Sequence, residues 1–182
     1  MNHQHEILPG LWIGDSYSRK NSYWLSREGI RVIINCTPDL DFVNMTSIIH
    51  YRYPMRDGAK GDSNWKAMKN GSDMILKQYG YWITDSSGNI QRQTSTKEVS
   101  KVLVHCHQGL SRSASVIGCY LIRYCRWSGE EAIRWIKARR PGSLNYLGFR
   151  KMLWKWDSIT NKNDDEKEKK DKNDTLDIEY KI

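Results

Sequence analysis

The sequence lacks long apolar runs, a secretion signal and paired cysteines. Within its 182 residues, no apolar stretch approaches the ~18 residues of a membrane-spanning helix. The opening, MNHQHEILPG, has no signal-peptide pattern, so we expect a soluble protein of the cytoplasm or nucleus with no membrane span. The four cysteines form no Cys-x-x-Cys pair and no zinc-like spacing with histidine, which argues against a disulfide scaffold or a metal site and predicts free thiols.

Charge is unevenly distributed along the chain. The formal net charge is +8, but the last 22 residues (161–182) hold 6 lysines against 8 acidic residues, so the preceding body carries +10. We expect residues 1–160 to form one catalytic domain and residues 161–182 to be a charged, disordered tail. The basic body points to anionic partners such as phosphoproteins, phospholipid head groups or nucleic acid, although a solvated lysine-rich surface would give the same charge.

Short β-rich runs alternate with helical periodicity. Strands are expected at Leu11–Ile13, Arg31–Asn35, His50–Met55 and Lys101–Cys106. Apolar residues at helical spacing predict helices over residues 68–83, 117–124 and 149–156, and Ser128 with Glu131 forms a capping box for a helix running through Arg140. The polar stretch Ser86–Ser100 is a surface insertion or a substrate-facing flap. This alternation is typical of an α/β domain with a central, mostly parallel sheet of four to five strands flanked by helices.

The segment VLVHCHQGLSRSAS, residues 102–115, places a cysteine and an arginine in a loop between a strand and a helix. Backbone N–H groups of such a loop can converge on one anion, and the helix N-terminus adds positive potential that favours the thiolate of Cys106. Arg112 has a planar guanidinium that can hold two phosphate oxygens at once. The pattern therefore predicts that Cys106 attacks a bound phosphate ester. The residues expected to bind the phosphate are His107, Gln108, Gly109, Leu110, Ser111 and Arg112. The alternative is a structural cysteine beside a structural arginine.

VHCHQGLSRSAS resembles the HCxxGxxR signature of cysteine-based protein tyrosine phosphatases, and its SRS ending is similar to the dual-specificity branch. The likeness covers nearly the whole body: LPGLWIGDSYSRKNSYWLSREGIRVIINCTPD resembles the family's opening, HYRYPMRDG its general-acid segment and WSGEEAIRWIKARRPGS its penultimate helix. The resemblance implies a tyrosine-phosphatase-like fold and a two-step reaction without metal or cofactor. Cys106 would attack phosphorus, and water would then hydrolyse the phosphocysteine.

The resemblance also implies an aspartate that protonates the leaving oxygen and then activates water. Asp57 matches that position, but it lies 49 residues before Cys106, farther than is usual in the family. The insertion at Ser86–Ser100 accounts for most of the excess. Asp62 is the second choice and Asp73, inside a predicted helix, the third. An aspartate before glycine is also a common turn residue.

Four polar residues near these segments have expected supporting roles. Ser113 matches the family hydroxyl that helps the thiolate leave phosphorus, although helix capping would equally explain it. We expect His105 to hydrogen-bond at the strand end without touching substrate, and Asn35 to tie loops together. Cys36 is expected to be a core thiol, with a redox pair with Cys106 as the alternative.

Two departures from the family pattern bear on the pocket. Asn145 stands one residue farther from Phe149 than the common pattern, which puts its support of the loop in doubt. The segment that deepens the pocket around phosphotyrosine in tyrosine-selective members is not found. A shallow cleft that admits phosphoserine, phosphothreonine and phosphotyrosine is therefore expected.

Three functions are compared. The first is dephosphorylation of phosphotyrosine and phosphoserine or phosphothreonine in proteins. The second keeps the catalyst but takes RNA 5′-phosphates or phosphoinositides, which the basic body, Arg56 and the His107-Gln108 pair would favour. The third is a catalytically silent phosphate-binding module, which would expect Cys106 or Arg112 to be replaced, yet both are present.

Overall fold

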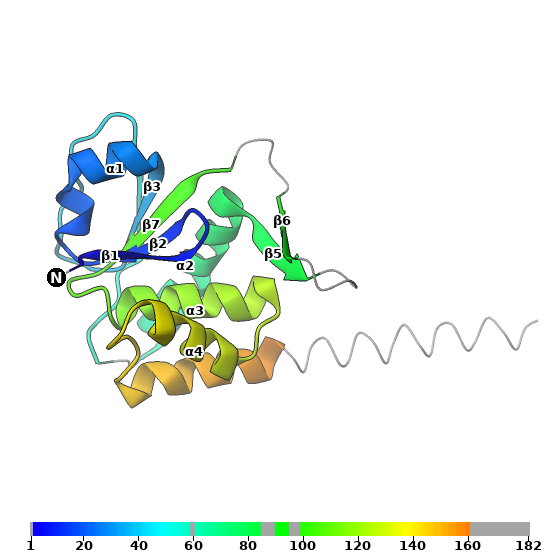
Figure 1. Ribbon diagram of the computed structural model, residues 1–182. Helices are drawn as coiled ribbons and strands as arrows, with labels where there is room; N and C mark the ends of the chain where they lie inside the picture. The colour runs from blue at the N-terminus through cyan, green and yellow to red at the C-terminus, as the bar shows by residue number, and fades with distance from the viewer. Residues whose placement is uncertain (1, 59–60, 85–89, 95–98, 161–182) are drawn as a thin grey trace, which may run out of the picture.

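The predicted strands lie in the central sheet of the domain. The computed structural model describes residues 2–58, 61–84, 90–94 and 99–160 (Figure 1). The five-stranded sheet has the order β1-β2-β7-β3-β4. Its strands are β1 (Gln4–Leu8), β2 (Leu11–Gly14), β3 (Ile30–Asn35), β4 (Ile49–Arg52) and β7 (Lys101–His105). Four of them run parallel and β1 is an antiparallel edge, so the predicted α/β class with a mostly parallel sheet is confirmed.

Alternate residues of the central strands enter two different cores. Val32, Ile34 and Val104 belong to the larger core, with residues of α2 (Asp62–Tyr79), α3 (Arg112–Cys125) and α4 (Gly129–Arg139). Ile33 and Leu103 belong to a smaller core with α1 (Ser22–Glu28). In Figure 1, α1 accordingly lies on the opposite side of the sheet from α3 and α4. Burial on both faces explains why these strands read as continuous apolar runs.

The helices begin and end where local chemistry dictates. Ser128 and Glu131 form the predicted capping box at the start of α4. A further helix covers residues 147–160, as the periodicity around Phe149 predicts. Glycine has a low helix propensity, yet Gly71 lies within α2. Packing explains it, because a Cβ at this position would lie 2.8 Å from Cγ1 of Val116 on α3. Of the described helices, none combines the length and apolar character needed to cross a bilayer.

The helix expected over residues 68–83 is displaced along the chain: α2 begins earlier, at Asp62, and also ends earlier. α2 ends at Tyr79, and Gly80 follows with φ 80° and ψ −161°, which leaves the helical region. Ile83, counted in the helical face, lies instead in β5 (Tyr81–Thr84). The apolar spacing of Ile83 fits a helix by coincidence, and the conformation at Gly80 decides against it.

Besides β5, two further strands, β1 and β6 (Ile90–Gln93), are absent from the sequence-based prediction. β1 pairs with β2 through the Pro9-Gly10 turn, where Gly10 has φ 85°. Part of the Ser86–Ser100 stretch forms β6, which pairs with β5. Ser100 leads directly into the amino end of β7, so the described part of the stretch lies away from the loop that follows β7, which favours a surface insertion over a flap. The tail predicted over 161–182 lies outside the described residues.

Candidate active site

The loop of residues 106–111 joins the carboxyl end of β7 to the first turn of α3. The two neighbouring parallel strands end at the same edge of the sheet as β7, because Gly14 of β2 and Asn35 of β3 both pair with His105. The loops after three strands therefore gather at one edge of the sheet, the usual place for a site in a parallel sheet.

Gly109 makes the tight course of this loop feasible. It has φ 65°, and a Cβ at this position would lie 2.3 Å from the carbonyl oxygen of Gly14. Any other residue would be strained and would also clash with backbone. A glycine is therefore required at this position, both by the loop conformation and by the contact with the end of β2.

The Cys106 thiol lies at the base of the loop and is 2% exposed. The backbone N–H of Gly109 donates to Sγ at 3.2 Å, and Oγ of Ser113 lies 3.3 Å from the same atom. Gly109 belongs to the loop and Ser113 to the first turn of α3, whose N-terminal end carries the positive end of the helix dipole. The sulfur therefore faces polar groups of both the loop and the helix.

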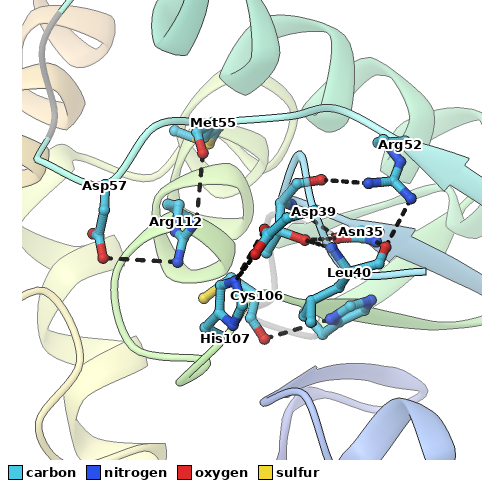
Figure 2. Close-up of polar contacts among 11 residues, drawn as sticks. Asn35, Asp39, Leu40, Arg52, Met55, Asp57, Cys106, His107 and Arg112 are labelled. Carbon is cyan, nitrogen blue, oxygen red and sulfur yellow. Dashed lines mark hydrogen bonds and ion pairs between the residues drawn. The ribbon is translucent and has the colours of Figure 1, made fainter. Parts of the chain in front are cut away.

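Three of the predicted catalytic residues meet in one cavity (Figure 2). Arg112, 7% exposed, directs one guanidinium nitrogen to the carbonyl oxygen of Met55 at 3.5 Å and another to Oδ2 of Asp57 at 3.7 Å. The carboxyl of Asp57 is 77% exposed and stands at the cavity mouth. The cavity, about 130 Å³ in volume, is lined by Asp57, Cys106, His107, Gln108, Ser111 and Arg112. Of the predicted loop residues, Leu110 instead lines a neighbouring cavity.

The other two aspartates lie elsewhere. Asp62 is the first residue of α2 and lines a separate cavity. Although burial opposes it, hydrogen bonds from Tyr124, Lys69 and Arg123 hold the pKa of Asp73 below its usual value, so this carboxylate joins α2 to α3. Among the three candidates, the geometry favours Asp57 as the acid.

Asn64 holds the acid segment in place, a role that the sequence did not reveal. Its Oδ1 accepts from the backbone N–H of Arg56 at 2.8 Å, and its Nδ2 donates to the carbonyl oxygen of the same residue at 3.0 Å. The side chain is fully buried in α2. This two-point contact fixes the residue directly before Asp57 and therefore the direction from which the carboxyl enters the cavity.

Replacing Asn64 is expected to impair proton transfer more than binding. In Asn64→Ala, we expect kcat for a phosphotyrosine peptide to fall by up to roughly 10², because a small misplacement of a catalytic group has effects of this size. KM should change less than about threefold, since Cys106 and Arg112 remain in place. Steady-state kinetics would test this, with Asn70→Ala on the same helix as the matched control. A raised KM with unchanged kcat would contradict it.

Arg140 supports the catalytic loop from the far end of α4, and sequence reasoning missed it. Its Nε donates to the carbonyl oxygen of Gly109 at 2.6 Å and one Nη to that of Gln108 at 2.9 Å. The other Nη lies 2.7 Å from Nδ1 of His5. Burial and the nearby arginine lower the pKa of His5, which keeps the imidazole a neutral acceptor. The one available signal was an arginine directly before Pro141-Gly142, where the helix stops.

His107 is held by Asp39, a third residue whose role the sequence analysis did not predict. Nε2 of His107 lies 3.0 and 2.8 Å from the two carboxylate oxygens of Asp39 (Figure 2). This hydrogen bond lowers the pKa of Asp39. Asn35 accepts hydrogen bonds from Thr37 and donates one to the carbonyl oxygen of Leu40, so these contacts order its own loop, whereas a tie between loops was expected. The side chain of His107 is therefore engaged with protein at the rim of the cavity.

Two residues at the strand ends behave as core groups. His105 is 1% exposed, and burial lowers its pKa to about 3, so it is neutral; Nδ1 lies 3.5 Å from the carbonyl oxygen of Cys106. Burial raises the pKa of the Cys36 thiol well above its usual value. A protonated, fully buried thiol fits the expected core role of Cys36 better than that of a redox partner.

The segment after α4 contacts the loop through its backbone. The N–H of Leu144 donates to the carbonyl oxygen of Leu110 at 2.8 Å. Oδ1 of Asn145 instead accepts from Nζ of Lys137 at 2.6 Å. The doubt about Asn145 was therefore justified, and Leu144 and Arg140 support the loop from this side.

Comparison with known proteins identifies a family and several relatives. The family model described as "Dual specificity phosphatase, catalytic domain" matches residues 11–159. Dual specificity protein phosphatase 14 of Mus musculus is 26% identical over 153 residues, covering 84% of this chain and 68% of the relative. The Slingshot homolog of Xenopus laevis is 27% identical over 161 residues, which is 87% of this chain but only 20% of the relative. The chain thus spans about a fifth of that relative's length.

Solved structures share the fold. Human DUSP28 superposes with a TM-score of 0.69 at 21% identity, covering 87% of this chain and 95% of that one. PTPMT1 in complex with PI(5)P superposes with a TM-score of 0.63 at 18% identity, covering 89% of this chain and 99% of that one. The match of the family model to most of the chain shows that this protein belongs to the dual specificity phosphatase catalytic domain family.

Proposed function

We propose that this chain is a cysteine-dependent phosphatase acting on phosphotyrosine, phosphoserine and phosphothreonine in proteins. The observation that carries the proposal is the single cavity of about 130 Å³ that brings together Cys106, Arg112 and Asp57. Family membership supports the reaction class, since its description and the names of its relatives refer to dual specificity. The presence of both Cys106 and Arg112 argues against a silent phosphate-binding module.

In the first step, the Cys106 thiolate attacks phosphorus while the Arg112 guanidinium holds two of its non-bridging oxygens. The bond from phosphorus to the substrate oxygen breaks, and that oxygen takes the proton of Asp57 and leaves as an alcohol or phenol. The products of this step are a phosphocysteine and a deprotonated Asp57.

In the second step, water attacks the phosphocysteine. The Asp57 carboxylate takes a proton from this water, so one carboxyl group serves both steps. The sulfur–phosphorus bond breaks, and the thiolate that forms accepts hydrogen bonds from the Gly109 N–H and the Ser113 hydroxyl, which lie 3.2 and 3.3 Å from Sγ. Inorganic phosphate leaves, and the enzyme returns to its starting state once Asp57 retains the proton.

The shape of the site supports broad residue specificity. The carboxyl of Asp57 is 77% exposed at the mouth, so the acid is reached from near the surface. A phosphoserine or phosphothreonine has a short side chain and requires such a shallow site, whereas phosphotyrosine can use a shallow or a deep one. The proposal therefore includes phosphoserine, phosphothreonine and phosphotyrosine as substrates.

Phosphoinositides are the second candidate substrate. The basic body of the chain favours anionic substrates, and PTPMT1, which shares the fold, has been solved in complex with PI(5)P. RNA 5′-phosphates receive less support, because the imidazole of His107 is already bonded to Asp39.

A comparison of substrates tests the proposal. Phosphate release would be measured without added metal from a phosphotyrosine peptide, a phosphothreonine peptide, a short-chain phosphoinositide and a 5′-triphosphorylated RNA. The Cys106→Ser variant gives the background for each substrate. Release from both peptides that exceeds release from lipid and RNA is the expected result. Preference for the lipid or the RNA would replace the proposed substrate class, and cysteine-independent release would remove the mechanism.

A further inference from the structure

A second, larger cavity lies directly beside the catalytic one. Its volume is about 590 Å³, and His107 and Gln108 line both cavities. The N-terminal segment forms its other side, with His3 before β1 and Tyr17 after β2. A peptide whose phosphate enters the catalytic cavity would place a neighbouring residue over this one, since successive residues of an extended chain are about 3.3 Å apart.

Much of the wall of this cavity consists of rings and aliphatic groups. The rings of His3 and Tyr17 lie 5.2 Å apart at 43° to each other, and Leu110 and Pro141 line the side nearest the catalytic loop. The side chain of Tyr17 is 68% exposed, so it is accessible to an incoming side chain. Such a wall favours a large apolar or aromatic side chain, which gains by leaving water.

Each charged group in the cavity is already paired. Arg140 is the one arginine or lysine among the described residues that line it, and its three nitrogens contact Gly109, Gln108 and His5. Nδ1 of His3 lies 2.7 Å from Oδ2 of Asp15.

The third imidazole, that of His107, is bonded to Asp39. No cation is therefore left free in the described lining to receive a second phosphate, and the carboxylate of Asp15 would repel one.

We propose that this cavity is a specificity subsite for a large apolar or aromatic side chain next to the phosphorylated residue. The inference rests on the proposed protein phosphatase function and narrows its substrates to singly phosphorylated segments. Doubly phosphorylated segments are disfavoured, because the second phosphate would meet a ring-lined cavity whose cation is engaged. The net positive charge of the body alone would favour highly anionic substrates, whereas this cavity favours a singly phosphorylated segment with a neighbouring apolar side chain.

The test is a set of phosphotyrosine peptides of equal length. Phenylalanine, alanine or phosphothreonine would be placed singly at each of the two positions on either side of the phosphotyrosine, and kcat/KM measured for each peptide. At one position we expect phenylalanine to exceed alanine by roughly tenfold, the lower end of what apolar contacts in a pocket provide. Phosphothreonine at that position should give no gain.

Two variants assign the preference to the cavity. Tyr17→Ala should bring the phenylalanine-to-alanine ratio towards one. Tyr23→Ala removes an equally exposed tyrosine from α1, outside the cavity lining, and should leave both the ratio and the basal rate unchanged. Because the readout is a ratio, a general loss of activity in Tyr17→Ala does not affect its interpretation.

The outcomes separate the two proposals. Equal rates for phenylalanine and alanine at all four positions, or a ratio that survives Tyr17→Ala, would overturn the subsite while leaving the phosphatase function intact. A gain from phosphothreonine would also overturn it, in favour of an anion site. Hydrolysis of no peptide at all would refute the protein phosphatase function, and the subsite with it.

Discussion

Cys106→Ser is expected to lower phosphate release from a phosphotyrosine peptide by a factor on the order of 10⁶, as removal of a nucleophile does in other hydrolases with covalent intermediates. A serine hydroxyl stays protonated where a thiol ionises, so the donors around the sulfur cannot make it an effective nucleophile. Binding of the same peptide should persist, because Arg112 and the loop backbone are unchanged. Single-turnover phosphate release and calorimetric titration would measure the two effects separately.

Cys36→Ala is the matched control. This thiol lies at the end of the neighbouring strand, is fully buried and has its pKa raised by burial, so its loss should leave kcat nearly unchanged. If Cys106→Ser kept its turnover, the phosphocysteine mechanism would be wrong. A comparable loss of turnover in folded Cys36→Ala would give that residue a chemical role that its environment does not predict.

Asp57→Asn is expected to lower kcat by roughly 10²–10⁴, the usual contribution of a general acid. The amide cannot protonate the leaving oxygen or activate water, but it keeps the size of the side chain. The loss should be larger for a phosphothreonine peptide than for para-nitrophenyl phosphate, because an alkoxide needs a proton to leave and a nitrophenolate does not. Steady-state kinetics on both substrates would show the difference.

Asp62→Asn provides the comparison for Asp57→Asn. Asp62 starts α2 and lines a different cavity, so its amide variant should keep nearly full activity on both substrates. A loss of activity confined to Asp62→Asn would indicate that Asp62, and not Asp57, is the general acid. An equal loss for both substrates in Asp57→Asn would contradict proton donation and indicate a role for Asp57 in binding.

Much of the fold follows from local patterns. The apolar run ending at His105, the glycine at 109 and the helical spacing after Arg112 are each short-range signals, and together they correctly predicted a loop between a strand and a helix. The extent of α2 was misjudged because Ile83 continues the apolar spacing while Gly80 ends the helix. β1 was missed because its sequence, QHEIL, is largely polar and an edge strand buries less of its surface.

The supporting residues of the site could not be predicted in the same way. Asp39 contacts His107 across 68 positions of sequence, and Arg140 contacts Gly109 across 31. No periodicity or spacing reports such pairs, since they depend on how the strands order in the sheet. Asn64 is closer, 8 positions from Arg56, but a single asparagine near the start of a helix does not show which backbone groups it contacts.

The contact between His5 and Arg140 has a consequence for folding. These residues are 135 positions apart, and Trp135 also donates to the carbonyl oxygen of Ile7, 128 positions away. Closing so long a loop costs chain entropy before the contact gives any stabilisation, and pairings of this kind form slowly. Because Arg140 also holds the carbonyl groups of Gln108 and Gly109, we expect this loop to reach its final form late in folding, after the two ends of the domain have met.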